Sequence, residues 1–97
     1  MKVLVADDDQ VFVELISSRL RSERFQVMVA FDATQTMLMA MRHKPDAILL
    51  DIRMPGGSGL DTLRKLKSSV KTAMVPVIVV TSLEDPGAEQ SALSLGA

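Results

Sequence analysis

The chain has 97 residues, which suits one domain, and 11 Lys and Arg nearly balance 12 Asp and Glu, giving a formal net charge of −1. This balance excludes a strong general attraction to nucleic acid or to an anionic membrane, and the absence of cysteine excludes disulfides and thiolate metal sites. Every apolar run is too short to span a membrane, and the apolar stretch at the amino terminus is too short for a signal peptide. We therefore expect a soluble, cytoplasmic protein without a membrane partner.

Short apolar runs alternate with stretches of helical periodicity along the whole chain. The apolar runs predict strands over 3–6, 26–31, 47–50 and 77–80. Apolar residues recur at helical spacing in three stretches and predict a helix in each: Phe12, Leu15, Ile16 and Leu20; Ala33, Met37, Ala40 and Met41; and Leu60, Leu63, Leu66 and Val70. A weaker pattern predicts a fourth helix over 84–95. Asp9 and Asp32 are placed to cap the first two helices, and Pro45 ends the second. The order strand–helix, repeated four times, predicts a parallel α/β sheet covered on both faces.

Polar side chains gather where the predicted strands end. Asp7 and Asp8 follow the first strand, Asp51 follows the third, and Thr81 follows the fourth. Ligands of open parallel sheets bind beyond the carboxyl ends of the strands. If the first and third strands are neighbours, the three carboxylates converge, with the Thr81 hydroxyl across the pocket.

Three carboxylates in one pocket cannot all stay ionised unless a cation joins them or one takes up a proton. Oxygen ligands without His or Cys favour Mg²⁺ over Zn²⁺, and such a site suits a phosphoryl group. Taken singly, each residue also has a structural explanation: Asp7 and Asp8 as helix caps, Asp51 as a turn residue, and Thr81 as a cap of the last helix. Their coincidence at equivalent strand ends favours a site.

Other features of the sequence favour ordinary structural roles. The segment 57–59 lacks the spacing and the lysine of a phosphate-binding loop. His43 stands at a polar helix end and is expected to be solvated, and Asp46 is expected to be a turn residue. The seven methionines are expected to fill the core.

Four segments together resemble the receiver domain of two-component response regulators. They are residues 3–9, residues 47–56 with their Asp51 to Pro55 motif, Gly59 with Leu60, and residues 76–82. The resemblance covers the whole chain in order and spacing. It implies a flavodoxin-like doubly wound parallel sheet, here with strands in the order 2-1-3-4 and with strand five and helix five missing.

The resemblance also implies a role for each residue of the predicted site. Asp51 would be the phosphoacceptor, receiving its phosphoryl group from a histidine kinase or a histidine phosphotransfer protein. Asp8, Asp51 and the backbone carbonyl of Arg53 would ligate Mg²⁺ directly, and Asp7 would act through a metal-bound water. Thr81 would be the switch hydroxyl that moves onto the phosphoryl group. Such a domain is a signalling protein and at most phosphorylates and slowly dephosphorylates itself, so it is not an enzyme.

The sequence departs from the family at its carboxyl end. Family members carry a fifth strand and helix, with a lysine that pairs with the phosphoryl oxygen, whereas this sequence stops at Ala97 after the fourth helix. Residues 1–97 are therefore expected to be a receiver domain that is incomplete at the C-terminus. The strand over 77–80 would then be an apolar edge. We expect it to pair with another chain, to form a swapped homodimer, or to be covered by further residues.

Two alternative functions are distinguished by a phosphorylation test and by the residue at position 53. A receiver-like protein-interaction module, unable to switch without the family's lysine, would not be phosphorylated by a small acyl phosphate with Mg²⁺. A phosphohydrolase with an aspartate nucleophile, similar to haloacid dehalogenases, needs a second Asp two residues after the nucleophile. That position holds Arg53, which cannot act as an acid or base. No nucleic-acid partner is expected through this domain.

Arg53 and Leu83, each two residues beyond Asp51 or Thr81, predict a long-lived phosphorylated state. In the family these positions tune how fast the phosphoryl group is lost, and neither a bulky Arg nor an apolar Leu positions an attacking water well. We expect slow loss of label in the complete domain and faster loss in Arg53→Asn and Leu83→Glu, measured by radiolabel decay. Rapid loss that both substitutions leave unchanged would refute this.

Overall fold

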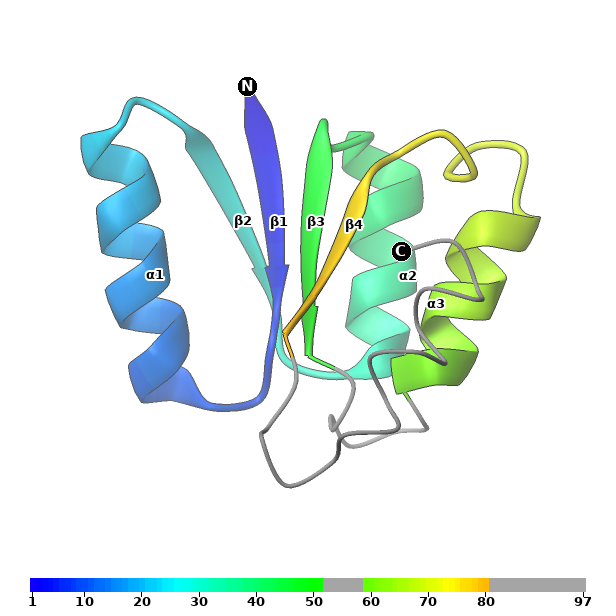
Figure 1. The fold of residues 1–97 in the computed structure, drawn as a ribbon, viewed down its shortest axis with the longest axis horizontal. Coiled ribbons are helices and arrows are strands. Elements are labelled where there is room, and N and C mark those ends of the chain that lie inside the picture. Colours follow the sequence, from blue (N-terminus) through cyan, green and yellow to red (C-terminus); the bar gives the residue numbers. More distant parts are fainter. Residues whose placement is uncertain (52–58, 81–97) are drawn as a thin grey trace.

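The centre of the molecule is a sheet of four parallel strands, seen in a computed structural model that describes residues 1–51 and 59–80. The elements are β1 (Lys2–Ala6), α1 (Gln10–Ser22), β2 (Gln26–Ala30), α2 (Ala33–His43), β3 (Ala47–Asp51), α3 (Gly59–Ser68) and β4 (Val77–Val80). The strands lie in the order β2-β1-β3-β4, with α1 on one face and α2 and α3 on the other (Figure 1). The predicted doubly wound α/β fold and its strand order are confirmed. The helix predicted over 84–95 lies outside the described residues.

The central strand β1 is buried on both faces, as its unbroken apolar run predicts. Val3 and Val5 pack toward α1, while Leu4 and Ala6 face α2 and α3. Around them the two cores are completed by buried side chains from every described element: Val13 on the α1 side, and Ala30, Ala40, Ile48, Leu50, Leu63, Leu66 and Val77 on the other. Fully burying a Val, Leu or Ile side chain stabilises a fold by about 1.5–3 kcal/mol, and several such side chains enclose β1 and fix its position.

Some residues predicted to be buried are exposed. Leu15 is 68% exposed, because α1 turns Val13 and Ser17 toward the sheet instead. Val70 is 96% exposed, because α3 ends at Ser68 before the stripe reaches it. These predictions were wrong because α1 carries apolar residues around much of its surface and α3 is shorter than its apolar pattern.

The methionines do not all fill the core. Met1 and Met74 lie outside any element and are largely exposed, and Met41 is exposed on α2. His43, as predicted, is exposed at the end of that helix. Asp46, predicted to be a turn residue, also contacts the start of β1: its carboxylate accepts a hydrogen bond of 2.7 Å from the backbone N–H of Lys2.

Strand β4 is an edge within the described part of the chain. It pairs with β3 on one side, and no strand among residues 1–51 and 59–80 pairs with its other side. Ile78, predicted to be buried, is 55% exposed there. Pairing of this edge with another chain stays a prediction. None of the helices in the described residues is long and apolar enough to cross a membrane.

The predicted helix caps are confirmed by hydrogen bonds. The Asp9 carboxylate accepts from the N–H groups of Val11 and Phe12, and the Asp32 carboxylate accepts from the N–H of Gln35 at 2.7 Å. Both caps stand where a strand end turns into a helix. They fix the direction in which α1 and α2 leave the carboxyl edge of the sheet.

The ends of α1 and α2 use left-handed backbone at residues other than glycine. Arg24 has a φ of 70°, and the N–H groups of Arg24 and Phe25 donate to the carbonyls of Arg21 and Leu20 in a Schellman motif. Lys44 has a φ of 48°. A side chain in this conformation costs about 1–2 kcal/mol, a cost that glycine avoids.

Replacing Arg24 by glycine is therefore expected to stabilise the protein. The relief of strain outweighs the extra freedom of glycine in the unfolded chain, so Arg24→Gly should raise the free energy of unfolding by about 0.5–1 kcal/mol. The matched control is Ser18→Gly in the exposed middle of α1, which should lower the free energy by roughly 0.5 kcal/mol. Urea denaturation measures both. A loss of stability in Arg24→Gly would contradict the assigned backbone conformation.

Candidate functional site

Three carboxylates meet at the carboxyl edge of the sheet. β1 and β3 are neighbours, with Ala6 opposite Leu50, so Asp7 and Asp8 leave one strand beside Asp51, which ends the other. One oxygen from each of the three side chains lies within 4.8 Å of the others. The predicted convergence of these residues is therefore observed. Their separate roles as ligand and phosphoacceptor stay predictions.

Asp7 is fixed in place by the backbone on both sides. Its N–H donates to the carbonyl of Ala30 at 3.0 Å, which extends the β1–β2 pairing by one residue. Its Oδ1 accepts the N–H of Asp9 at 2.9 Å in an Asx turn. Asp9 was predicted to act only as a helix cap, so this second contribution, from its backbone N–H, was not predicted. The sequence does carry a sign of this turn. An Asp side chain often accepts the N–H of the residue two positions later, and here that residue is the helix cap Asp9.

The environment of Asp7 disfavours its charged form. Asp7 is 7% exposed, and this burial, together with the charge of Asp51, hydrogen bonding with Asp51 and the charge of Asp8, raises the pKa of Asp7 from 3.8 to about 6. The hydrogen bond from the N–H of Asp9 acts in the opposite direction and lowers the pKa. Two like charges 4 Å apart repel by about 4 kcal/mol at an effective dielectric constant near 20. Either a proton or a cation relieves this repulsion.

The donor set fits a hard divalent cation. All three groups offer carboxylate oxygens, and their exposure rises from buried Asp7 through half-buried Asp51 to exposed Asp8, so one side of the cluster faces solvent. The only histidine of the chain, His43, lies at the end of α2, away from the strand ends that hold the cluster. Oxygen ligands, few in number and open to water on one side, suit Mg²⁺.

Two predicted site residues, Arg53 and Thr81, lie outside the described residues. Thr81 directly follows Val80, whose partner in the β3–β4 register is Asp51. The roles of Thr81 and of the Arg53 carbonyl stay predictions from the sequence.

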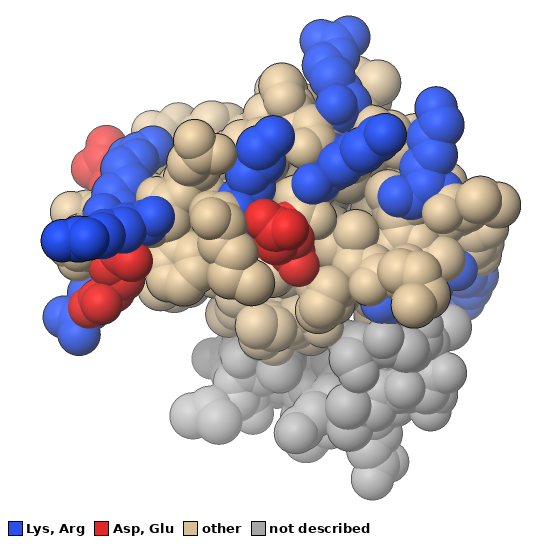
Figure 2. Space-filling model, turned by 90° about the horizontal axis from the view of Figure 1, so that it is seen from above, with Lys and Arg blue, Asp and Glu red and all other residues tan. Residues whose placement is uncertain are grey.

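The opposite edge of the sheet carries charge of the other sign. Figure 2 shows this edge, where most of the charged side chains in view are Lys and Arg. The last turns of the three helices supply Arg19 and Arg21, Arg42 and His43, and Lys65 and Lys67. Basic residues are favoured at helix C-termini by the helix dipole. Among the described residues, basic side chains thus gather at one edge of the sheet and the carboxylate cluster lies at the other, a distribution that favours a cation at the acidic edge.

The doubly wound parallel sheet, with polar groups gathered at its carboxyl edge, defines a class of α/β domain whose ligands bind beyond the ends of the strands. A sequence profile described as "Response regulator receiver domain" matches residues 3–97. The chain therefore belongs to the response regulator receiver domain family.

Individual relatives agree with this assignment. The response regulator PleD of Caulobacter vibrioides is 38% identical over 96 residues, which is 99% of this chain and 21% of PleD. The BeF3-activated N-terminal receiver domain of Klebsiella pneumoniae RstA is 29% identical, with a TM-score of 0.90 over 100% of this chain and 80% of that one. The receiver domain of the sensor histidine kinase PA1611 from Pseudomonas aeruginosa PAO1, with a magnesium ion coordinated in its active site cleft, is 29% identical with a TM-score of 0.88 over 98% and 78%. The chain thus spans about a fifth of the length of PleD.

The raised pKa of Asp7 predicts how the stability of the metal-free protein depends on pH. The folded state binds a proton up to about pH 6, whereas the unfolded state releases it near 3.8, so the free energy of unfolding falls as pH rises through this window. Above pH 6, Asp7→Asn should therefore stabilise the metal-free protein by about 1–3 kcal/mol, with little effect below pH 4.

Thermal or urea unfolding in a chelator between pH 4 and pH 8, read at roughly one-unit steps, measures this effect. Glu14→Gln on exposed α1 is the matched control, and its effect should stay within about 0.5 kcal/mol throughout. If Asp7→Asn changed the free energy of unfolding by the same amount at every pH, the destabilisation could not arise from the charge of Asp7.

Proposed function

We propose that this receiver domain carries a phosphoryl group on Asp51, with Mg²⁺ held by the cluster of Asp7, Asp8 and Asp51. The observation that carries the proposal is the approach of one oxygen from each carboxylate to within 4.8 Å. Such a cluster is costly without a cation, and a cation held by these carboxylates would neutralise charge on a group attached to Asp51.

Asp51 fits the role of phosphoacceptor better than its two neighbours. Asp7 is buried, and its Oδ1 already accepts the Asp9 amide, so it is suited to binding rather than attack. Asp8 is exposed at the beginning of the turn into α1. Asp51 is half-buried at the end of β3, a rigid strand, and combines access with a fixed position. The resemblance to the family supports the same choice of phosphoacceptor.

In the proposed reaction, a carboxylate oxygen of Asp51 attacks the phosphorus of a phosphohistidine in line. The new O–P bond forms as the P–N bond breaks, and the donor imidazole leaves with the electron pair of that bond. When bound, Mg²⁺ neutralises charge on the transferring oxygens. β1 and β3 hold the three carboxylates in a fixed arrangement, so little reorganisation is needed as charge develops.

The donor is proposed to be a histidine kinase or a histidine phosphotransfer protein. Arg53, through its backbone carbonyl, is proposed to complete the metal site. The Thr81 hydroxyl is proposed to bond the phosphoryl group and so to bias the surrounding surface between two states. The chemistry ends in stoichiometric modification of Asp51 and its slow reversal, which supports a signalling role and not turnover of a substrate.

Incubation with acetyl phosphate and Mg²⁺ tests this function. The intact protein should gain the mass of one phosphoryl group, located on Asp51 by peptide mass spectrometry. No gain in mass is expected when a chelator is present during the incubation. Asp51→Asn should also abolish the gain, because the amide is not a nucleophile at this oxygen. Asp32→Asn is the matched control, since it removes a carboxylate at the same sheet edge outside the cluster and keeps the helix cap. Modification that persists in Asp51→Asn would overturn the assignment.

A further inference from the structure

The outer edge of β2 presents unpaired backbone groups in a strand conformation. The N–H of Gln26 donates to the carbonyl of Met1, and the carbonyl of Ala30 accepts from the N–H of Asp7. The backbone N–H and C=O groups of the even-numbered residues of β2 therefore point toward β1. Backbone groups of successive residues in a strand point to opposite sides. Val27 and Val29 therefore direct their N–H and C=O groups away from β1. No strand in the described ranges pairs with them there.

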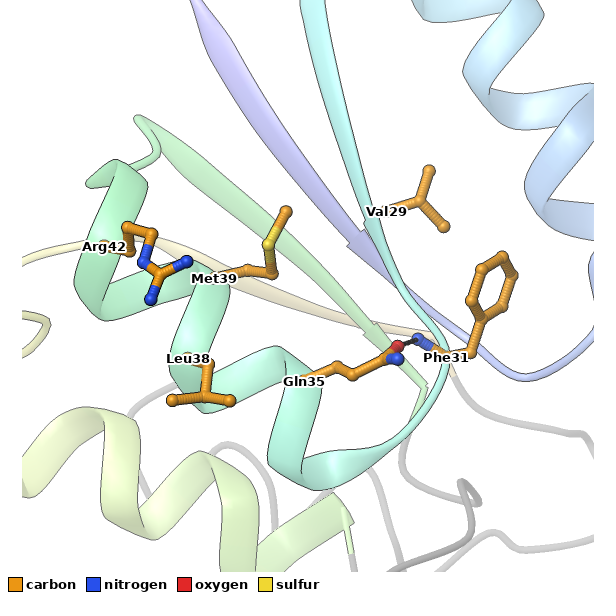
Figure 3. Close-up of a pocket in the computed structure, with 6 residues that line it drawn as sticks. All are labelled: Val29, Phe31, Gln35, Leu38, Met39 and Arg42. Atoms are coloured by element: carbon orange, nitrogen blue, oxygen red, sulfur yellow. Dashed lines mark hydrogen bonds between the residues drawn. The ribbon is translucent and has the colours of Figure 1, made fainter.

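This edge lies along an apolar groove of about 300 Å³ (Figure 3). The side chains of Val29 and Phe31 stand on one side of the β2 ribbon, and the lining residues of α2 stand on the other. Two apolar side chains of the lining are open to solvent, Phe31 at 40% and Leu38 at 59%. The groove thus passes over the strand edge itself, with apolar surface on both sides of it.

The two ends of the groove are polar and differ in character. At one end the Oε1 of Gln35 accepts a hydrogen bond of 2.8 Å from the N–H of Phe31 (Figure 3). This bond satisfies the outward-pointing N–H that directly follows β2. At the other end stands Arg42, in the last turn of α2. Arg42 forms no ion pair with any residue of 1–51 or 59–80. An acidic group would complement it.

We propose that this groove binds an extended peptide segment of a partner protein, which adds to the edge of β2 as a further strand. The outward groups of Val27 and Val29 have the spacing of a strand and match an extended backbone. Apolar side chains of the segment would pack on Phe31 and Leu38, and a carboxylate of the segment would face Arg42.

The edge lacks the usual protection against such pairing. Exposed edge strands of natural proteins are commonly guarded by charged residues, proline or a bulge. The sequence of β2, Gln26–Ala30, contains neither a charged residue nor proline, and its pairing with β1 is regular along its length. Among the outward backbone groups of residues 27, 29 and 31, the N–H of Phe31 is the one that a side chain covers, through its hydrogen bond to Gln35. The proposal is independent of phosphorylation, because no member of the carboxylate cluster lines the groove.

Selection of random linear peptides displayed on phage against the 97-residue chain tests the proposal. We expect binders with an alternating apolar pattern and an acidic residue. In ¹⁵N-labelled protein, the amides of Val27 and Val29 should shift and become protected from hydrogen exchange when the peptide is added. A peptide that is N-methylated at the residues facing β2 should lose binding, whereas methylation at the alternate residues should spare it.

Two substitutions in the groove should weaken the selected peptides by at least about tenfold, Arg42→Glu and Leu38→Asp. Their matched controls carry the same changes on α1, Arg21→Glu and Leu15→Asp, and should bind as the parent does. Both groove positions are on the surface, and circular dichroism checks that the fold is kept. Failure to select any peptide, or binding that the groove substitutions leave unchanged, overturns the proposal.

Discussion

Mutual repulsion among three carboxylates is the interaction on which the rest of this structure depends. The side chains of Asp7, Asp8 and Asp51 would separate in water, yet the pairing of β1 with β3 holds their oxygens within 4.8 Å. The repulsion of each pair is a few kcal/mol, comparable to the contribution of one or two buried core residues. The protein can sustain it because β1 is enclosed on both faces. Relief of this repulsion would favour binding of the cation that we propose for the site.

The same central strand determines where chemistry and binding can occur. At the carboxyl edge of the sheet the acidic groups collect, while basic residues in the last helical turns collect at the other edge (Figure 2). Among the described residues that line the groove at the β2 edge, Arg42 alone has an ionisable side chain. A phosphoryl site and a peptide-binding edge on one small domain would thus use separate surfaces, so that occupation of one need not block the other.

The strands, and the sheet edge at which the carboxylates lie, follow from local sequence patterns, whereas the β1–β3 adjacency that brings the carboxylates together was implied by the family resemblance. An unbroken apolar run indicates a strand buried on both faces, as Val3–Ala6 of β1 are, and parallel strands end at one edge. Prediction from the sequence failed for Leu15, since α1 has apolar residues on more than one side and only packing decides which side meets the sheet. It also missed the Asp9 amide that holds Asp7, because a capping role already explained that residue. Arg53 and Thr81 rest on the sequence alone.

The central claim is that one divalent cation binds between the carboxylates of β1 and β3. The most direct measurement is a crystal structure of the chain soaked in Mn²⁺ at neutral pH, with the ion located by its anomalous scattering. The account predicts one peak in contact with carboxylate oxygens of Asp8 and Asp51 and near Asp7, lost in crystals of Asp51→Asn. A map with no peak at this edge, or with the three side chains pointing apart, would contradict it.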